Sequence, residues 1–361
     1  MSIKSLLLPA LALTMATALA GCGSSSKTAA DAAGGAGGSS GSGGSTASIG
    51  VGYFQSATLG PEVLIAGNQS LASKIDGTFK LTPIDSGVAG LAELRGGAFP
   101  FVSGVGNPPV VGAIAAGTKL KVIYGEYFDA AQLIVGPDIT SNDQLAGKTI
   151  GDLQGSSEDF EIRGWLSKQG LTDQVKVVGF PSEAAVAAAF KAHRIDAGYV
   201  EIAQALDLKA NAQGRQVVTA EEIAKLGFPS LNVLAVTDDY AAEHPEVVQQ
   251  VVCQTMHAET LAAGPDADTY IKAAAGTVGA TPDDAVAATT VIPWVSGKDE
   301  LSWFEGPSGD VKDGQMAKAY ALTAQFLKDQ GRVTSVPTTD QIAGALDDSY
   351  VKKALKDGCD K

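Results

Sequence analysis

The sequence predicts an α/β protein made of two α/β lobes that face each other across a cleft. From residue 48 onward, short apolar runs typical of strands alternate with helical patterns, as in parallel βαβ units. This part holds roughly 310 residues, enough for two domains. One block of strands and helices, 137–229, interrupts another, 48–136 and 230–361. We therefore expect the chain to pass twice between a discontinuous lobe I and an inserted lobe II.

The elements of lobe I follow from short apolar runs and the residues that interrupt them. Pro61 stands at a first helical position, where its missing N–H is tolerated, and Asp85-Ser86-Gly87 marks a turn before a helix. The expected strands are 48–55, 80–84, 99–105 and 120–127. The expected helices are 61–76, 88–95 and 110–116.

Lobe II repeats this alternation, and the chain then returns to lobe I and becomes mostly helical. Residues 132–135 are expected to form the strand with which the chain leaves lobe I. The expected strands of lobe II are 149–153, 175–178, 197–200 and 216–219, and its helices are 142–145, 158–169, 182–192, 202–211 and 221–225. The return strand is expected at 231–236, before helices at 245–263, 282–289, 314–329 and 339–346.

The first 47 residues have the pattern of an export signal (1–21) and a tether (22–47). Lys4 precedes an apolar run too short to span a bilayer, and Leu-Ala-Gly stands directly before Cys22. This pattern resembles a bacterial lipobox, which implies acylation of Cys22; the alternative is an ordinary signal with an incidental cysteine. The Gly/Ser-rich tether would be flexible. We expect an exported protein, held by lipid at the outer face of the cell membrane or on its periplasmic side.

Charge and composition exclude several classes of protein. The formal net charge is −14 without basic clusters, which disfavours nucleic-acid binding, and we interpret the acidity as solubility of an exported protein. His193, His244 and His257 lack metal-ligand spacing, and there is no Gly-x-Ser-x-Gly motif. We therefore expect no enzymatic activity, no cofactor and no metal. Cys253 and Cys359 form an even pair in an exported chain, which favours a disulfide over two separate thiols.

Candidate ligand-binding residues stand where expected strands end, because open α/β sheets bind ligands outside the carboxyl ends of their strands. Gly155-Ser156-Ser157 precedes a helix whose N-terminus suits an anion, although Glu158 and Asp159 would oppose one if they face the cleft. Each candidate residue also has an alternative interpretation without a ligand. The strand-end residues would form plain helix caps and turns, Glu201 would be a solvated acid, and Trp294 would be a core residue. The candidates are Gln55, Asp85, Ser86, Gly106, Asn107, Ser156, Ser157, Glu201 and Trp294.

Six stretches resemble the substrate-binding proteins of taurine, sulfonate and nitrate importers, and they occur in that family's order. They are Phe54–Ala57, Ile84–Gly87, Arg194–Val200, Pro229–Leu234, Glu243–Val248 and Thr323–Gly331. The resemblance implies a type II periplasmic-binding-protein fold, two lobes with a hinge, that closes on one small solute. It also implies a monomer that docks onto an ABC permease with its ATPase.

Two positions depart from the taurine-binding members of that family. Glu201 stands where they have Trp, and Asn232, which joins the candidates, stands where their returning strand has Asp. We therefore expect a small polar solute such as taurine or another amino-sulfonate, with its amine held by Glu201 and its polar head by Ser86 and Ser156. The alternatives are a nitrate-like anion, a sulfonate or a pyrimidine, or a sensor lipoprotein without a transporter. An enzyme of the thiamine-pyrimidine synthase type is disfavoured, because that family carries a cysteine-rich cluster.

Overall fold

The computed structural model describes residues 48–295 and 297–361. The expected signal segment, the expected lipidation site Cys22 and the expected tether lie outside the described residues. None of the helices in the described ranges combines the length and the apolar character needed to cross a bilayer. The fold begins with the strand that starts at Ser48.

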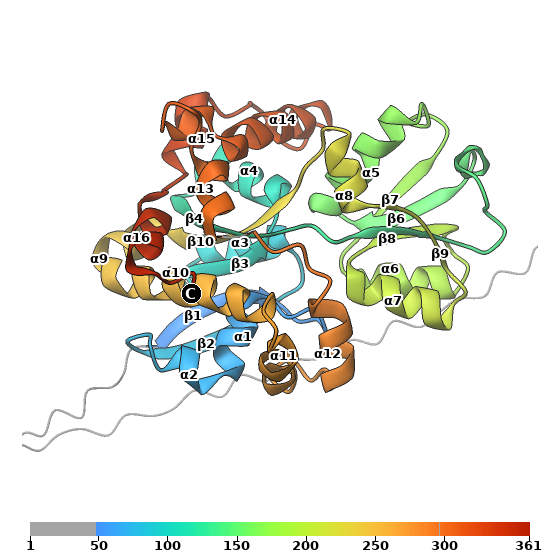
Figure 1. The fold of residues 1–361 in the computed structure, drawn as a ribbon. Coiled ribbons are helices and arrows are strands. Elements are labelled where there is room, and N and C mark those ends of the chain that lie inside the picture. The colour runs from blue at the N-terminus through green and yellow to red at the C-terminus, as the bar shows by residue number, and fades with distance from the viewer. Residues whose placement is uncertain (1–47, 296) are drawn as a thin grey trace, which may run out of the picture. The chain divides into compact units, whose positions relative to one another are not determined.

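Lobe I is built on a five-stranded sheet in the order β2-β1-β3-β10-β4 (Figure 1). Its strands are β1 (Ser48–Phe54), β2 (Thr78–Ile84), β3 (Phe101–Val105), β4 (Leu120–Phe128) and β10 (Leu231–Thr237). β1 pairs in parallel with β2 and β3, and β10 runs antiparallel between β3 and β4. Because β1 to β4 share one direction, their carboxyl ends reach the same edge of the sheet.

Lobe II contains a second five-stranded sheet, in the order β7-β6-β8-β5-β9. Its strands are β5 (Gln132–Val135), β6 (Thr149–Leu153), β7 (Lys176–Phe180), β8 (Ala197–Val200) and β9 (Arg215–Thr219). β6 is parallel to β7 and β8, whereas β5 is antiparallel to β8 and β9. Each sheet thus contains one strand that runs antiparallel to its neighbours. In lobe I this strand is β10, the first strand after the chain returns from lobe II, and in lobe II it is β5, the first strand after the chain leaves lobe I.

The two passages between the lobes lie side by side. The chain leaves β4 through residues 129–131 and returns through residues 226–230, and the Asp129 N–H donates a hydrogen bond to the Ser230 carbonyl oxygen at 3.1 Å. The predicted boundary between 136 and 137 is therefore wrong by a few residues, because β5 belongs to the sheet of lobe II. An apolar run of four residues carries no information about which sheet it joins.

Helices cover the sheets and make up most of the chain after β10 (Figure 1). Before β10 they are α1 (Pro61–Gly67), α2 (Gln69–Ala72), α3 (Gly87–Arg95), α4 (Asn107–Ala115), the 3-10 helix η1 (Asn142–Leu145), α5 (Ser157–Lys168), α6 (Glu183–Lys191), α7 (Ile202–Asn211) and α8 (Ala220–Lys225). After it come α9 (Asp238–Glu243), α10 (Pro245–Ala262), α11 (Ala267–Ala275), α12 (Pro282–Thr289), α13 (Gly297–Phe304), η2 (Val311–Asp313), α14 (Gln315–Asp329), α15 (Thr339–Gly344) and α16 (Ser349–Asp357). The helix expected at 61–76 is interrupted at Asn68, whose extended backbone separates α1 from α2.

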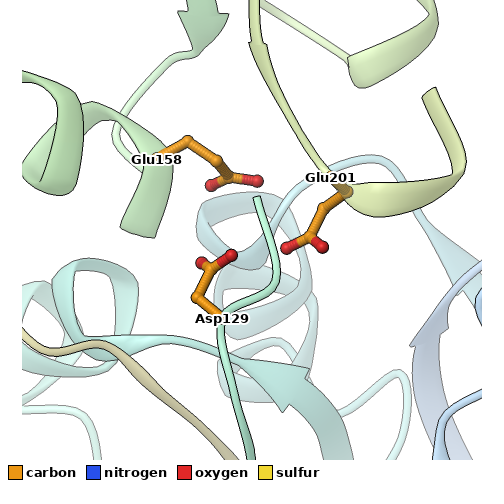
Figure 2. Close-up of side chains that lie close together, drawn as sticks. All are labelled: Asp129, Glu158 and Glu201. Atoms are coloured by element: carbon orange, nitrogen blue, oxygen red, sulfur yellow. The ribbon is translucent and has the colours of Figure 1, made fainter. Parts of the chain in front are cut away.

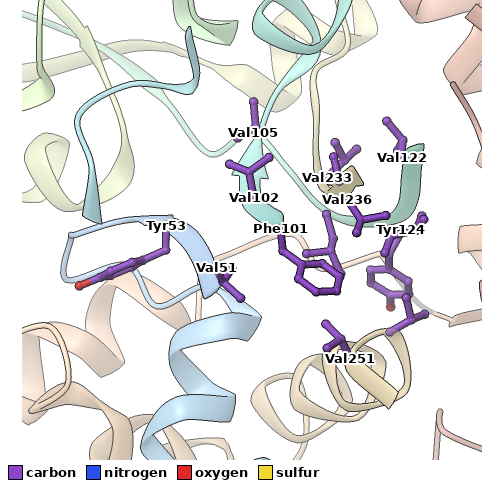
Figure 3. Close-up of a cluster of buried hydrophobic side chains, with 14 of the residues drawn as sticks. Val51, Tyr53, Phe101, Val102, Val105, Val122, Tyr124, Val233, Val236 and Val251 are labelled. Carbon is purple, nitrogen blue, oxygen red and sulfur yellow. The ribbon is translucent and has the colours of Figure 1, made fainter. Parts of the chain in front are cut away.

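Apolar side chains fix both sheets and therefore the positions of their strand ends. In lobe I, Val51, Phe101 and Val233 pack with Val251 of α10 in one continuous core (Figure 3). In lobe II, successive residues of β5 alternate between two clusters on opposite faces of the sheet. A disulfide between Cys253 of α10 and Cys359, 106 residues apart, ties the C-terminal segment to the lobe I core.

Candidate functional site

A cleft of about 350 Å³ lies between the lobes, where the carboxyl ends of their strands meet. Lobe I contributes Phe54, Gln55, Ser56, Thr58, Gly60, Glu62, Pro83, Ile84, Asp85, Gly87, Gly104, Gly106, Pro109, Tyr127 and Asn232. Lobe II contributes Leu153, Ser156, Ser157, Glu158, Ser182, Glu183, Ala184, Glu201 and Gln204. Five of these residues are acidic, and within the described part of the chain the lining contains no Lys, Arg, His or Cys.

Three carboxylates converge in this region: Asp129, Glu158 and Glu201, here called the acidic trio (Figure 2). One oxygen of each lies within 4.8 Å of one oxygen of each of the other two. Asp129 and Glu158 are only 2% and 4% exposed, and Glu201 is half-buried. A single ligand group can therefore touch all three carboxylates at once.

Asp129 is held in place by the first passage between the lobes. In addition to the backbone hydrogen bond to Ser230, its Oδ1 accepts from the Ala131 N–H at 2.9 Å, which stabilises the turn. Its Oδ2 has no hydrogen-bond partner. The carboxylate faces Glu158 and Glu201 (Figure 2), so one oxygen fixes the turn and the other remains available.

Glu158 and Glu201 are placed by the helices that follow β6 and β8. The Ser156 hydroxyl caps α5, donating to the Leu153 carbonyl at 2.6 Å and accepting from the Asp159 N–H at 3.5 Å, and this puts Glu158 in the first turn. Glu201 directly precedes α7, and its N–H donates to Glu183 Oε2 at 3.1 Å. Glu183, the first residue of α6, therefore stands beside the trio as a fourth carboxylate, and its Oε1 has no partner.

Burial raises the pKa of the three carboxyl groups of the trio and of Glu183. It is the main cause for Asp129. The pKa values of Glu158 and Glu201 are raised well above their usual range by burial and then by the charge of Asp129. Burial raises the pKa of Glu183 to about 7. Because adjacent buried carboxylates cannot all be ionised unless a cation meets them, the pocket alone holds protons near neutral pH.

A second acidic pair lies on the lobe I side and is joined through Ser103. The Ser103 Oγ is 2.7 Å from Glu62 Oε2 and 2.6 Å from Glu126 Oε1, while Glu126 Oε2 accepts from the Gly104 N–H at 2.7 Å. A serine hydroxyl has one hydrogen, so only one of its two short contacts can be donated by Ser103. The other hydrogen must come from a carboxyl group. Accordingly, burial raises the pKa of Glu62 to about 7 and that of Glu126 to about 8.

Seven of the ten residues predicted to bind ligand line the cleft: Gln55, Asp85, Gly106, Ser156, Ser157, Glu201 and Asn232. Three do not, each for a local reason. The Ser86 hydroxyl caps α3 by accepting from the Ala89 N–H at 3.2 Å. The Asn107 side chain donates to the Pro229 carbonyl at 2.9 Å and secures the second passage. The Trp294 ring packs edge-on against Tyr127, 5.6 Å between centroids, and so supports the lining from behind.

The expected anion site at the N-terminus of α5 does not fit this geometry. Glu158, in the first turn, lines the cleft. Asp159 accepts from the Gly155 N–H at 3.4 Å and is paired with Arg163 and Arg332. The helix N-terminus is thus already occupied by acidic side chains, and an anion could bind there only while Glu158 stays protonated.

Asp129, Glu158 and Glu183 are not among the residues predicted from the sequence to bind ligand. Glu158 was considered as an acid in the first turn of a helix that would oppose an anion in the cleft, and not as a binding residue. Glu183 follows Ser182, the cap of the helix after β7, and Asp129 follows β4 directly. All three are the first or second acid after a strand of the two sheets. The strand-end rule that selected Glu201 would have selected them too, had it been applied to every strand.

Comparison with known proteins assigns the fold. Residues 42–277, well over half of the chain, match the NMT1-like family. The taurine-binding periplasmic protein of Escherichia coli (strain K12) is 25% identical over 297 residues, covering 80% of this chain and 88% of that protein.

Two solved structures illustrate the likeness in fold. The alkanesulfonate-binding protein SsuA from Xanthomonas axonopodis pv. citri, bound to MOPS, matches with a TM-score of 0.64 at 20% identity, covering 84% of this chain and 98% of that one. The periplasmic nitrate-binding protein NrtA from Synechocystis PCC 6803 matches with a TM-score of 0.68 at 10% identity, covering 86% and 89%. The predicted two-lobed α/β fold of periplasmic binding proteins is therefore confirmed.

Proposed function

The chain belongs to the NMT1-like family, and on that premise we propose that it is the solute-binding protein of an ABC importer. We further propose that its solute is small, organic and positively charged. It would bind in the cleft between the lobes and be handed to a permease driven by an ATPase.

The charge of the cleft carries this proposal. Its lining holds Glu62, Asp85, Glu158, Glu183 and Glu201, and no basic side chain within the described residues balances them. Taking carboxylates out of water as the lobes close costs free energy unless a cation meets them. Hydrogen bonds from an ammonium group would offset that cost, whereas a nitrate or a simple sulfonate would add repulsion. An amino-sulfonate such as taurine remains compatible through its amine.

The remainder of the solute would contact the lobe I side of the cleft. That side is mostly neutral, with aromatic rings from Phe54 and Tyr127 and amide groups from Gln55 and Asn232. A cavity of about 350 Å³ falls in the range of small-molecule sites. The lining has no Cys or His in its described residues, and we propose binding without catalysis.

A screen by thermal shift tests the proposal, because a ligand stabilises the folded state by about 2.7 kcal/mol at 100 times its Kd. The panel comprises amines, amino-sulfonates, amino acids, nitrate, alkanesulfonates, carboxylates and pyrimidines. We expect stabilisation only by compounds that carry a cationic nitrogen. Stabilisation by nitrate or by sulfonates without an amine, and by nothing else, would contradict it. Genes for a permease and an ATPase beside this one would favour transport over a sensor role.

Attachment to the membrane through Cys22 is part of the same proposal. A lipid anchor and a flexible tether would keep the binding lobes near the permease. Changing Cys22→Ser should move the protein from the membrane pellet to the soluble fraction. If the variant stays in the pellet, the anchor is elsewhere.

A further inference from the structure

We propose that the acidic trio is a socket for a primary ammonium group, which donates one N–H to each of Asp129, Glu158 and Glu201. The inference rests on the proposed function and names the chemical group that the site selects. Two independent observations support it: the spacing of the three carboxylates and the lack of partners for buried oxygens around them.

The three carboxylates of the trio lie close enough together for one ammonium group to reach all of them. Charge-assisted N–H···O bonds are about 2.8 Å long, and three tetrahedral donors on one nitrogen place their acceptors about 4.6 Å apart. The trio presents one oxygen from each residue within 4.8 Å of the others. The residues come from three elements, the β4–β5 passage, α5 and the start of α7, and converge on one point (Figure 2).

The second observation is the set of unpartnered oxygens. Asp129 is 2% exposed, and its Oδ2 has no hydrogen-bond partner. Glu183 Oε1 and Gln204 Oε1, both from the cleft lining, are also buried without a partner. In the empty pocket only the protons of neighbouring carboxyl groups can satisfy the carboxylate oxygens, which neutralises those acids, whereas an ammonium group brings its own donors and leaves the acids ionised.

The surroundings favour a primary ammonium group over other cations. A bare divalent ion would fill a small part of the cavity, since even a water molecule accounts for only about 30 Å³ of a volume of about 350 Å³. A quaternary ammonium group has no N–H to give and is usually held by aromatic cages. A guanidinium group spreads its N–H donors over three nitrogens, whereas three oxygens within 4.8 Å of one another can all be reached from a single nitrogen.

The titratable groups around the trio make binding sensitive to pH. They are Tyr127 from β4, Glu161 from α5, Glu183 from α6 and Tyr199 from β8, and none of them is a cation at neutral pH. An incoming ammonium group must therefore displace protons from the carboxyl groups. Binding should release protons and tighten as pH rises through the range in which these carboxyl groups ionise.

The experiment compares matched probes on the whole exported protein. Propylammonium, propyltrimethylammonium and propylguanidinium chlorides are tested by thermal shift and by isothermal titration calorimetry in phosphate and in HEPES, two buffers without a primary amine, and CaCl₂ is tested in HEPES alone. We expect propylammonium to stabilise the protein most and to release protons, seen as a binding enthalpy that depends on the buffer. Glu158→Gln and Glu201→Gln, which resemble the protonated acids, should each weaken propylammonium roughly 10- to 100-fold. Glu221→Gln on the exposed face of α8 is the control and should change nothing.

Two kinds of result overturn the inference. If the trimethyl analogue, the guanidinium analogue or Ca²⁺ binds as well as propylammonium, the socket does not select a primary ammonium group. If propylammonium fails to bind, or binds both Gln variants as tightly as the parent, the trio is not its site. The proposed function fails separately, when no cationic compound in the broader screen stabilises the protein.

Discussion

Glu126→Gln should stabilise the protein at alkaline pH, and the reason lies in the hydrogen bonds of Ser103. In the parent protein, either Glu62 or Glu126 must be protonated, because Ser103 has one hydroxyl hydrogen for its two short contacts. In the variant, the amide of residue 126 donates to Ser103, whose own hydroxyl then donates to an ionised Glu62. The amide oxygen still accepts from the Gly104 N–H. The variant therefore satisfies every atom without a titrating proton at residue 126.

The magnitude follows from the displaced pKa. The pKa of Glu126 rises from 4.5 to about 8 on burial, so the folded protein holds this proton more tightly than the unfolded chain. Stability from this group is therefore fully present below pH 4.5 and is lost as pH rises through about 8. Between pH 5.5 and 8.5 the parent should lose on the order of 3 kcal/mol through Glu126 alone. Glu126→Gln removes that loss.

The assay is urea denaturation of the parent and of Glu126→Gln at pH 5.5 and 8.5, without added ligand. The difference in unfolding free energy between variant and parent should be about 3 kcal/mol more favourable to the variant at pH 8.5 than at pH 5.5. Carboxyl groups that do not interact with residue 126 contribute equally to both proteins and cancel. The charge of Glu126 raises the pKa of Glu259 and of Glu300, so its removal adds to the advantage of the variant at pH 8.5. If the difference is the same at both pH values, Glu126 does not carry a bound proton in the folded protein, and the proton count at Ser103 is wrong.

Two further predictions concern the framework of the site. Replacing Cys253 and Cys359 together by Ala should lower the unfolding free energy by about 4–5 kcal/mol, because the disulfide closes a segment of 106 residues; a loss under about 1 kcal/mol in urea denaturation would refute this. Gly106→Ala should weaken binding of any cleft ligand roughly tenfold in calorimetry, since a Cβ at Gly106 would overlap the Ser157 Oγ and hold the lobes apart at a cost of about 1–3 kcal/mol. Unchanged affinity would mean that the two lobes do not need this contact to close.

The fold could be predicted from the sequence because its determinants are local. The apolar runs that form β1, β4 and β8 are bounded by turn residues, and their alternation with helices allows few other architectures. Strand ends could be located from the same runs, and with them residues such as Gln55 and Glu201. The place of β5 could not, because a run of four apolar residues pairs equally well in either sheet until the whole chain has folded.

The site was harder to predict because its contacts join residues distant in sequence. Asp129 and Glu201 are 72 residues apart, and the pairing of β5 with β8, which sets Gln132 opposite Val200, brings the first toward the second. Ser86 and Asn107 stand at strand ends as predicted, yet their side chains are used locally for a cap and a passage. Sequence gives the position of a side chain along an element, whereas the competition between local and cleft partners is decided in three dimensions.

The two lobes contribute different side chains to the cleft, and this difference suggests an order of events in binding. The carboxylates of the trio and Glu183 come from lobe II and the adjoining passage, so the charged contacts form on one lobe before closure. Lobe I contributes Glu62 and Asp85 together with neutral groups such as Gln55 and Asn232, and these would contact the rest of the solute. A cation would thus be drawn first to lobe II, where desolvation on closure strengthens its hydrogen bonds. Closure would then depend on how well the uncharged part of the solute fits against Phe54 and Tyr127. Charge would thus select the class of solute, and lobe I would select among the members of that class.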